Sequence, residues 1–150
     1  MTVENPKKLG FGLMRLPRRV VGNDIKQMSQ MVDLFMEAGC TYFDTAHVYL
    51  GSEEAARKAL VERYPRESFT LATKLYAPTA PTRHAAQKQF ATSLKRTGAS
   101  YIDYYLLHSL MGNNVHPLYE LQVLHEGLPA AHQYPRRVCC HEQPPARRCP

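Results

Sequence analysis

Four side chains within the first 108 residues are of the types that carry acid–base chemistry. Asp44 follows the apolar residues 41–43, Tyr49 lies five residues further on, and Lys74 and His108 end two later apolar runs. Because a neighbouring carboxylate keeps a partly buried lysine protonated, Asp44 would hold the charge on Lys74. That cation is expected to lower the pKa of Tyr49 and make it a general acid for a developing alkoxide. His108 could donate a hydrogen bond to the same oxygen and orient a carbonyl group.

Each of these residues also has a plainer interpretation. An aspartate or lysine at a strand end is usually solvated or caps the chain, and a lone tyrosine usually packs half-buried. A lone histidine, such as His108 or the nearby His47, is usually a satisfied polar group. The occurrence of these four residue types together, at or just after the ends of successive strands, is harder to explain by chance. It favours a functional site, provided that the surrounding elements bring these residues together.

The hydrophobic pattern predicts strands and helices in alternation, with one β-α unit in about thirty residues. Asp24 has the position of a helix N-cap, Gly39 and Gly98 have the position of helix stops, and Ser52 is expected to cap the second helix. The expected strands are 9–14, 41–44, 69–74 with a continuation to 76, and 101–107, and the expected helices follow Asp24, follow Ser52 and span 82–96.

Strands that alternate with helices of this length pair in parallel through right-handed crossovers. The C-terminal ends of parallel strands meet on one face, where the following loops carry the chemistry. Asp44, Lys74 and His108 end the second, third and fourth strands, and Tyr49 lies in the loop after the second. The sequence therefore predicts an α/β fold in which four groups from three successive strands converge. Apolar strands such as 104–107 are expected to be buried on both faces.

The character of the chain changes after residue 113. Residues 115–126 could begin a helix but have no clear cap, and from residue 127 onward prolines and arginines occur without a strand or helix period. Segments of that composition bury too little apolar surface to fold. We therefore expect one α/β domain in residues 1–126 and a disordered Pro/Arg/Cys-rich tail in residues 127–150.

Length, charge and hydropathy bound the class of protein. A chain of 150 residues is large enough for one domain with a real core. No apolar run reaches the ~18 residues that would span a membrane, and the N-terminus lacks the build of a secretory signal, so the expected location is the cytoplasm.

The four cysteines do not form a secreted disulfide framework, and Cys40 is expected to pack as a small hydrophobe. The net charge is +6, but half of it falls in the last 22 residues, so nucleic-acid binding is the weaker interpretation.

Four segments between residues 8 and 114 resemble the N-terminal half of the aldo/keto reductase family, in the order and spacing of that family. They read LGFGLMRLP, FDTAHVYLGSEEAARKAL, FTLATKL and YIDYYLLH. The resemblance implies a (β/α)8 TIM barrel that reduces small aldehydes and ketones with a hydride from NADPH, less often NADH, and uses no metal. The family's catalytic residues fall by motif on Asp44, Tyr49, Lys74 and His108, with Tyr49 as the proton donor.

The loop at the end of the first strand is similar to the part of the family that lies beside the nicotinamide and its ribose. It consists of Gly12, Leu13, Met14 and Arg15. The resemblance implies that these residues bind the NADP(H) cofactor and that Asp44 also contacts the ribose.

The chain departs from the family pattern in two small ways and one large way. Leu50 stands where a glycine commonly follows the catalytic tyrosine, and Arg57 stands where a glycine is frequent. The large departure is length, because a barrel of this kind needs ~250 residues. We therefore expect an incomplete barrel with about the first four βα units. Its open edges would be prone to self-association, and its NADPH binding would be weak or absent.

Two alternatives to an active reductase stay open. The chain could be a truncated and catalytically inactive fragment with a frame-shifted tail, because the resemblance stops abruptly near residue 120. It could also be a non-enzymatic module that binds a metal or a protein. Adjacent Cys139 and Cys140 lack the C-x2-C spacing of structural zinc sites, which weakens this second alternative. The metal-ligating residue types in the tail are His132, Cys139, Cys140, His141 and Cys149.

Overall fold

The computed structural model describes residues 7–20 and 22–109 of the chain. In this part, strands and helices alternate along the sequence as predicted. The elements are β1 (Gly10–Gly12), α1 (Ile25–Glu37), β2 (Tyr42–Asp44), α2 (Ser52–Ala56) with its π-helical continuation η1 (Arg57–Val61), the 3-10 turn η2 (Arg66–Ser68), β3 (Thr70–Tyr76), the 3-10 turn η3 (Ala77–Thr79), α3 (Arg83–Thr97) and β4 (Tyr104–His108).

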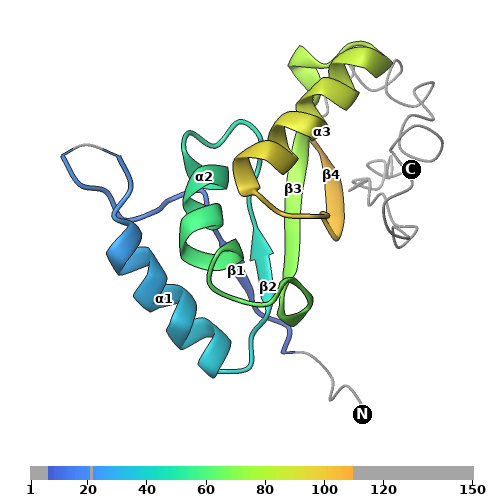
Figure 1. The fold of residues 1–150 in the computed structure, drawn as a ribbon. Coiled ribbons are helices and arrows are strands. Elements are labelled where there is room, and N and C mark those ends of the chain that lie inside the picture. The colour runs from blue at the N-terminus through green and yellow to red at the C-terminus, as the bar shows by residue number, and fades with distance from the viewer. Residues whose placement is uncertain (1–6, 21, 110–150) are drawn as a thin grey trace, which may run out of the picture.

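The four strands form one parallel sheet in the order β1-β2-β3-β4. One row of the register joins Gly12, Asp44, Ala72 and Tyr104. The three helices lie on one side of the sheet (Figure 1). Parallel strands connected through helices confirm the predicted α/β class. Within the described residues the sheet is open, with β1 and β4 as its edges.

The start of α1 and the end of α3 follow the predicted signals. Asp24 caps α1, since its carboxylate accepts a hydrogen bond from the Gln27 amide at 3.1 Å. Thr82 caps α3 in the same way through the Ala85 amide at 3.2 Å. Gly98 ends α3 in the left-handed conformation with a φ of +64°, which glycine adopts without steric cost.

Ser52 does not cap α2, contrary to the prediction. Gly51 takes the N-cap position with a φ of +69°, and Ser52 is the first helical residue. The Ser52 hydroxyl donates to the Leu13 carbonyl oxygen at 2.8 Å and shares a 2.6 Å hydrogen bond with the Thr45 hydroxyl. The serine therefore ties the start of α2 to the loops that follow β1 and β2.

The first and fourth strands depart most from the lengths that the pattern predicts. The first spans three residues rather than six, and Met14 and Arg15 turn to the surface. The fourth was expected to start at residue 101 but starts at Tyr104. Its start is delayed because the Asp103 carboxylate accepts a hydrogen bond from the Leu71 amide at 2.7 Å and pairs with Arg66.

A cluster of buried and half-buried aromatic rings joins α1 to the sheet. Phe43 of β2 is fully buried, and its ring centroid lies 5.7 Å from that of Phe11 and 5.2 Å from that of Phe35. Phe69 makes an edge-on contact with Phe43 at 6.2 Å. Each buried aromatic side chain removes a large apolar area from water, so this cluster is a main source of stability. Cys40 is buried as well, as predicted for a small hydrophobe.

Side chains alternate between two faces of the sheet. On the helix side, Phe43, Leu71 and Leu75 are buried. The opposite side holds the polar residues of the strand ends, which are half-buried. The prediction that residues 104–107 are buried on both faces is wrong, because Tyr105 is the one buried residue of β4. The buried side chain of β4 therefore lies on one face of the sheet only.

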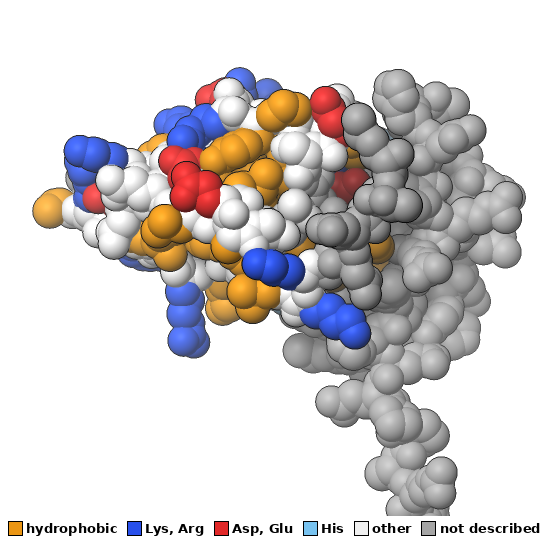
Figure 2. Space-filling view, turned by 90° about the horizontal axis from the view of Figure 1, so that it is seen from below, with side chains coloured by type: hydrophobic (Ala, Val, Ile, Leu, Met, Phe, Trp, Pro, Cys, Tyr) orange, Lys and Arg blue, Asp and Glu red, His pale blue; other side chains and the backbone are white. Residues whose placement is uncertain are grey.

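The outer surface carries scattered charges and some apolar side chains. Figure 2 shows lysine and arginine side chains interspersed with acidic and hydrophobic ones on the face seen from below. Met31 of α1 is among the exposed apolar side chains, with 38% of its surface accessible. Within residues 7–20 and 22–109, no helix is long and apolar enough to span a membrane.

Several predictions concern residues outside the described ranges. They are the helix expected within 115–126, the domain boundary at 126, the disordered tail at 127–150, and the metal-ligating residue types His132, Cys139, Cys140, His141 and Cys149.

Candidate active site

The four residues predicted to carry acid–base chemistry lie at the C-terminal end of the sheet. Asp44 is the last residue of β2 and His108 the last of β4, whereas Lys74 lies two residues before the end of β3. The register sets Asp44 beside Ala72 and aligns His108 with Tyr76. Because successive side chains of a strand alternate between faces, Asp44, Lys74 and His108 all lie on the face opposite the helices.

Asp44 and Lys74 form an ion pair, as predicted. The distance between Lys74 Nζ and Asp44 Oδ2 is 2.5 Å, and the same ammonium group donates to the Thr45 carbonyl oxygen at 2.7 Å. The Lys74 side chain is only 13% exposed, so the pair is shielded from water and weakly screened by salt. The lysine therefore fixes both the carboxylate and the first residue of the loop that leads to Tyr49.

Tyr49 lies between Lys74 and His108. Its ring centroid is 5.2 Å from Lys74 Nζ and 5.6 Å from the His108 ring centroid, and the two rings meet edge-on at 86°. The backbone of Tyr49 is held in two consecutive turns, because its amide donates to the Ala46 carbonyl oxygen and its carbonyl oxygen accepts from the Ser52 amide. The structure therefore brings all four predicted residues together.

The pKa of Tyr49 shifts in the direction opposite to the expected one. Burial raises this pKa above the ordinary value for tyrosine, and the negative charge of Asp44 raises it further. The expected lowering by Lys74 is absent because the lysine charge is paired with Asp44 and faces the ring of Tyr49. Tyr49 is therefore protonated at neutral pH.

His108 is held in a neutral state. Burial lowers its pKa, and the positive charge of Lys74 lowers it further, against an opposing effect of Asp44. Its Nδ1 atom is buried and has no hydrogen-bond partner among the described residues. A second tyrosine, Tyr76, stands with its ring centroid 6.3 Å from that of His108. A neutral imidazole in this position can donate one hydrogen bond and accept another.

The loop after β1 divides into exposed and buried parts. Gly12 is exposed, and a Cβ added to it would meet nothing within 4 Å. Met14 is 61% exposed and Arg15 is also on the surface. Leu13 differs from the other three, because its side chain is fully buried, its amide donates to the Asp44 carbonyl oxygen, and its own carbonyl oxygen accepts from Ser52. The space beside Asp44 on the open face of β1 is thus bordered by Gly12.

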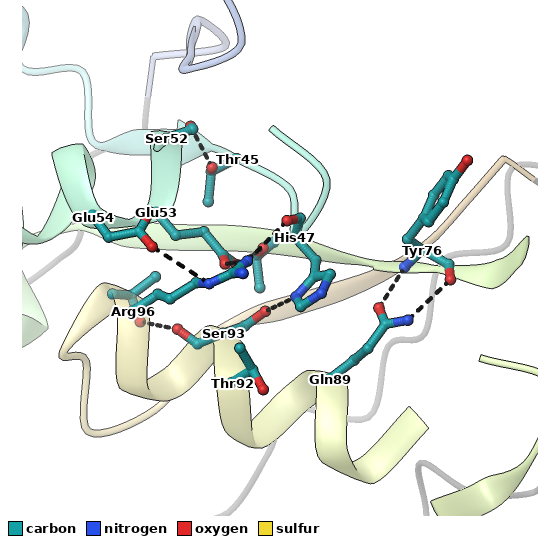
Figure 3. A network of polar contacts seen from close by, with 12 residues as sticks. Thr45, His47, Ser52, Glu53, Glu54, Tyr76, Gln89, Thr92, Ser93 and Arg96 are labelled. Carbon is teal, nitrogen blue, oxygen red and sulfur yellow. Dashed lines mark hydrogen bonds and ion pairs between the residues drawn. The ribbon is translucent and has the colours of Figure 1, made fainter. Parts of the chain in front are cut away.

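A buried polar network behind the loop was not predicted (Figure 3). Glu53 of α2 is only 1% exposed. Its carboxylate accepts a 2.8 Å hydrogen bond from the Thr73 hydroxyl and pairs with Arg96 of α3 at 3.4 Å. His47, expected to be a satisfied polar group, lies with its Nδ1 atom 3.4 Å from the Ser93 hydroxyl. No local signal marks this network, because its partners come from distant parts of the chain.

The end of β3 is also held by a side chain that the sequence did not single out. The Gln89 amide of α3 accepts from the Tyr76 amide at 3.1 Å and donates to the Tyr76 carbonyl oxygen at 3.2 Å (Figure 3). It also donates to the Thr79 hydroxyl at 2.9 Å. Gln89 therefore completes the hydrogen bonds of the backbone at the point where β3 leaves the sheet.

Comparison with known proteins agrees with this arrangement. The model of the aldo/keto reductase family matches residues 8–131. The chain is 34% identical over 111 residues to aldo-keto reductase str7 of Strobilurus tenacellus, which covers 67% of this chain and 33% of that protein. It is 37% identical over 73 residues to aldehyde reductase YPR1 of Saccharomyces cerevisiae, which covers 49% of this chain and 22% of that protein. The chain thus spans a third or less of the length of these relatives.

Solved structures show the same partial correspondence. The holo form of an aldo-keto reductase from Bacillus halodurans matches with a TM-score of 0.59 at 29% identity, over 75% of this chain and 41% of that chain. An aldo-keto reductase from Klebsiella pneumoniae in complex with NADPH matches with a TM-score of 0.59 at 26% identity, over 75% of this chain and 40% of that chain. The four described strands and the three helices between them correspond to part of the barrel in these structures, in agreement with the predicted incomplete (β/α)8 barrel. With its parallel sheet, its strand-end residues and its match over residues 8–131, the chain belongs to the aldo/keto reductase family.

Proposed function

We propose that this chain carries the proton-transfer residues of an NAD(P)H-dependent reductase of small aldehydes and ketones. The observation that carries the proposal is the meeting of Tyr49 with Lys74 and His108 around the Asp44–Lys74 ion pair. Membership of the aldo/keto reductase family supports an oxidoreductase. The cofactor is NADP(H), with NAD(H) as the alternative, and the chemistry requires no metal.

The residues at the end of β1 fit the nicotinamide end of such a cofactor. Gly12 leaves open space on the face that also bears Asp44, and its register partner is Asp44 itself. We assign Gly12, Met14 and Arg15 to cofactor contact, with Asp44 placed to reach the ribose. Leu13 has a different role in this proposal, because its buried side chain and occupied backbone groups anchor the loop. When bound, the reduced nicotinamide supplies a hydride to the carbonyl carbon.

Tyr49 donates the proton that the reaction needs. Its raised pKa keeps the hydroxyl protonated at neutral pH, so a proton is available when negative charge develops on the carbonyl oxygen. The O–H bond of Tyr49 breaks as the new O–H bond of the alcohol forms, and the phenolate that results is stabilised by the nearby Lys74 ammonium. Lys74 therefore contributes mainly by stabilising the Tyr49 phenolate that forms in this step, and it affects the protonated tyrosine less.

Asp44 and His108 support that transfer in different ways. Asp44 holds Lys74 through the 2.5 Å ion pair and so fixes the cation beside the tyrosine ring. His108, neutral through its lowered pKa, can donate a hydrogen bond to the carbonyl oxygen and orient it toward Tyr49. A preoriented donor of this kind stabilises the developing oxyanion without reorganisation.

The proposal is tested by an NADPH-dependent reduction of a generic aldehyde with the purified 150-residue chain. We expect any turnover to be weak and to be abolished by Tyr49→Phe, because phenylalanine keeps the ring and removes the proton. Tyr64→Phe is the matched control, since Tyr64 lies on the far side of the domain with its hydroxyl on Asp33. Equal turnover by Tyr49→Phe and the unsubstituted chain would refute the assigned role. No turnover at all, together with NADPH binding in a fluorescence titration, would favour the inactive-fragment alternative.

A further inference from the structure

The loop that carries Tyr49 is fixed by side chains from three other parts of the chain. Residues 45–51 connect β2 to α2, and Tyr49 lies near their middle. Three carbonyl oxygens of this loop accept hydrogen bonds from side chains that lie far away in the sequence. These bonds are Lys74 Nζ to Thr45 at 2.7 Å, Arg96 Nη1 to His47 at 3.0 Å and Asn23 Nδ2 to Gly51 at 3.0 Å.

Arg96 has no part in the chemistry proposed above. The carbonyl oxygen to which it donates belongs to His47, two residues before Tyr49. Arg96 belongs to the last turn of α3. Its guanidinium group also reaches two carboxylates of α2, with Nη1 3.4 Å from Glu53 Oε2 and Nε 3.4 Å from Glu54 Oε1. The planar fork of an arginine can make these contacts at once, which a lysine ammonium cannot do in the same geometry.

Glu53 holds Arg96 in place and connects it to the strand that bears Lys74. The Glu53 carboxylate is buried, and its other oxygen accepts a 2.8 Å hydrogen bond from the hydroxyl of Thr73, the residue before Lys74. Figure 3 shows Glu53 and Arg96 pointing toward one another behind the loop at His47. One carboxylate thus sets the position of Arg96 relative to β3.

The distances indicate that Arg96 does more than join α2 to α3. Its shortest contact, 3.0 Å, is to the His47 carbonyl oxygen, whereas both carboxylates lie at 3.4 Å. A charged donor at a backbone carbonyl makes a stronger hydrogen bond than a neutral one. The hydrogen bond to the His47 carbonyl oxygen is therefore the closest polar contact of this guanidinium group.

We propose that Arg96, held by the buried Glu53, is a positioning residue that fixes Tyr49 against Lys74 and His108. The inference rests on the proposed function of Tyr49 and deepens it. Without Arg96, the His47 carbonyl oxygen loses its side-chain donor, and the middle of the loop keeps only its backbone hydrogen bonds and the contact of His47 with Ser93. Tyr49 then samples positions away from His108 while Asp44 and Lys74 keep their ion pair.

The test uses the full chain, labelled with 15N and 13C, and compares Arg96→Gln and Arg96→Lys with the control Arg57→Gln. Arg57 is a matched arginine because it pairs with Glu62 at 2.7 Å on the surface and touches no residue of the Tyr49 loop in any described hydrogen bond. Hydrogen exchange at the Tyr49 amide reports the loop, since this amide donates to Ala46. The Leu71 amide, bonded to Asp103, reports the sheet.

We expect exchange at Tyr49 to become about tenfold faster in both Arg96 variants, with Leu71 unchanged, because local opening needs less free energy than global unfolding. The cross-relaxation between the Tyr49 and His108 rings should weaken in parallel, and Arg57→Gln should match the unsubstituted chain. Tyr49 exchange within twofold of the unsubstituted chain would overturn the proposal. Equal acceleration at Leu71 and Tyr49 in both Arg96 variants would also overturn it, in favour of a purely structural ion pair.

These measurements do not require turnover, so they separate this inference from the proposed reaction. If the chain reduces no aldehyde but the Arg96 variants accelerate exchange at the Tyr49 amide alone, the positioning role of Arg96 is supported and the proposed reductase function is refuted. In a chain that does turn over, Arg96→Lys should lower kcat several-fold and leave KM within twofold, because the substrate contacts remain. A change in KM alone would count against the proposal.

Discussion

The ammonium group of Lys74 is directed at the carboxylate of Asp44, with 2.5 Å between Nζ and Oδ2. This relationship decides the electrostatics of the whole site. A lysine whose charge is already paired does little to ionise a neighbouring phenol, and the pKa of Tyr49 is accordingly raised by burial and by Asp44. The site at rest is therefore built to keep the proton on Tyr49.

Replacing Lys74 by methionine should destabilise the fold. The substitution keeps the unbranched apolar stem of the side chain but leaves the Asp44 carboxylate and the Thr45 carbonyl oxygen without their donor. We expect a loss of about 1–3 kcal/mol in the free energy of unfolding, the usual cost of removing a charged hydrogen-bond partner from a partly buried site. Urea unfolding followed by circular dichroism measures it. Lys88→Met, at an exposed lysine of α3, is the control, and an equal effect in the two variants would contradict the argument.

The titration of Tyr49 gives a second prediction. Its midpoint, followed through the 13Cζ resonance, should lie above the value of ~10 that is normal for tyrosine, because burial and Asp44 both disfavour the phenolate. Asp44→Asn should lower the midpoint, since it removes the repelling charge and leaves the Lys74 cation unpaired. A midpoint below that of free tyrosine in the unsubstituted chain would restore the expectation drawn from the sequence.

His108 should titrate below its ordinary pKa of 6.5. Burial and the Lys74 cation disfavour the imidazolium in the folded state, so the unfolded chain binds a proton at a pH where the folded chain does not. The contribution of His108 to stability is therefore present above the unfolded pKa and is lost as the pH falls through the lower, folded pKa. NMR of the ring protons measures the midpoint. Lys74→Met should raise it, and a midpoint that stays unchanged in that variant would show that the lysine has no influence.

Much of this site follows from periodicity and topology. Strands with a period of two place Asp44 and Lys74 on one face, and parallel pairing brings their C-terminal ends together. That reasoning needs only local patterns, so it located Asp44, Tyr49, Lys74 and His108 correctly as neighbours. It could not predict whether the pKa of Tyr49 is raised or lowered, because that direction depends on which neighbouring group pairs with the Lys74 ammonium.

The features that sequence reasoning missed depend on partners distant in the chain. A glutamate in the first turn of a helix is usually solvated and complements the helix dipole, so Glu53 carried no sign of burial. Its partners Thr73 and Arg96 lie 20 and 43 residues away. Ser52 was misassigned for the same reason, since the Leu13 carbonyl oxygen that it binds is 39 residues away.

Self-association through the open edge of β1 is a further prediction. Unpaired strand edges and exposed apolar side chains favour pairing with another chain. Leu9 precedes β1 and is 60% exposed. We expect light scattering after gel filtration to give a mass above the 17.1 kDa of one chain, and Leu9→Lys to reduce it. Leu34→Lys, at an exposed leucine of α1, should leave the mass unchanged. A stable 17.1 kDa monomer would contradict the prediction.

Removing the hydroxyl of Tyr105 should stabilise the protein. The Tyr105 ring is buried against Phe90 with 4.8 Å between centroids, and its hydroxyl has no hydrogen-bond partner among the described residues. Because a buried and unpaired polar group has lost its hydration without compensation, Tyr105→Phe should raise the free energy of unfolding by about 1 kcal/mol. Tyr104→Phe, at the half-buried neighbour on the other face of β4, is the control.

The effect of Tyr105→Phe should grow at high pH. Burial and the negative charge of Glu53 raise the pKa of Tyr105 strongly in the folded state. Above the unfolded pKa of ~10, the unfolded chain loses this proton while the folded chain keeps it, so the stability of the unsubstituted chain falls as the pH rises. Phenylalanine has no proton to lose, and urea unfolding at pH 8 and pH 11 should show the two curves diverging. A variant that is less stable than the unsubstituted chain at pH 8 would mean that the hydroxyl has a partner.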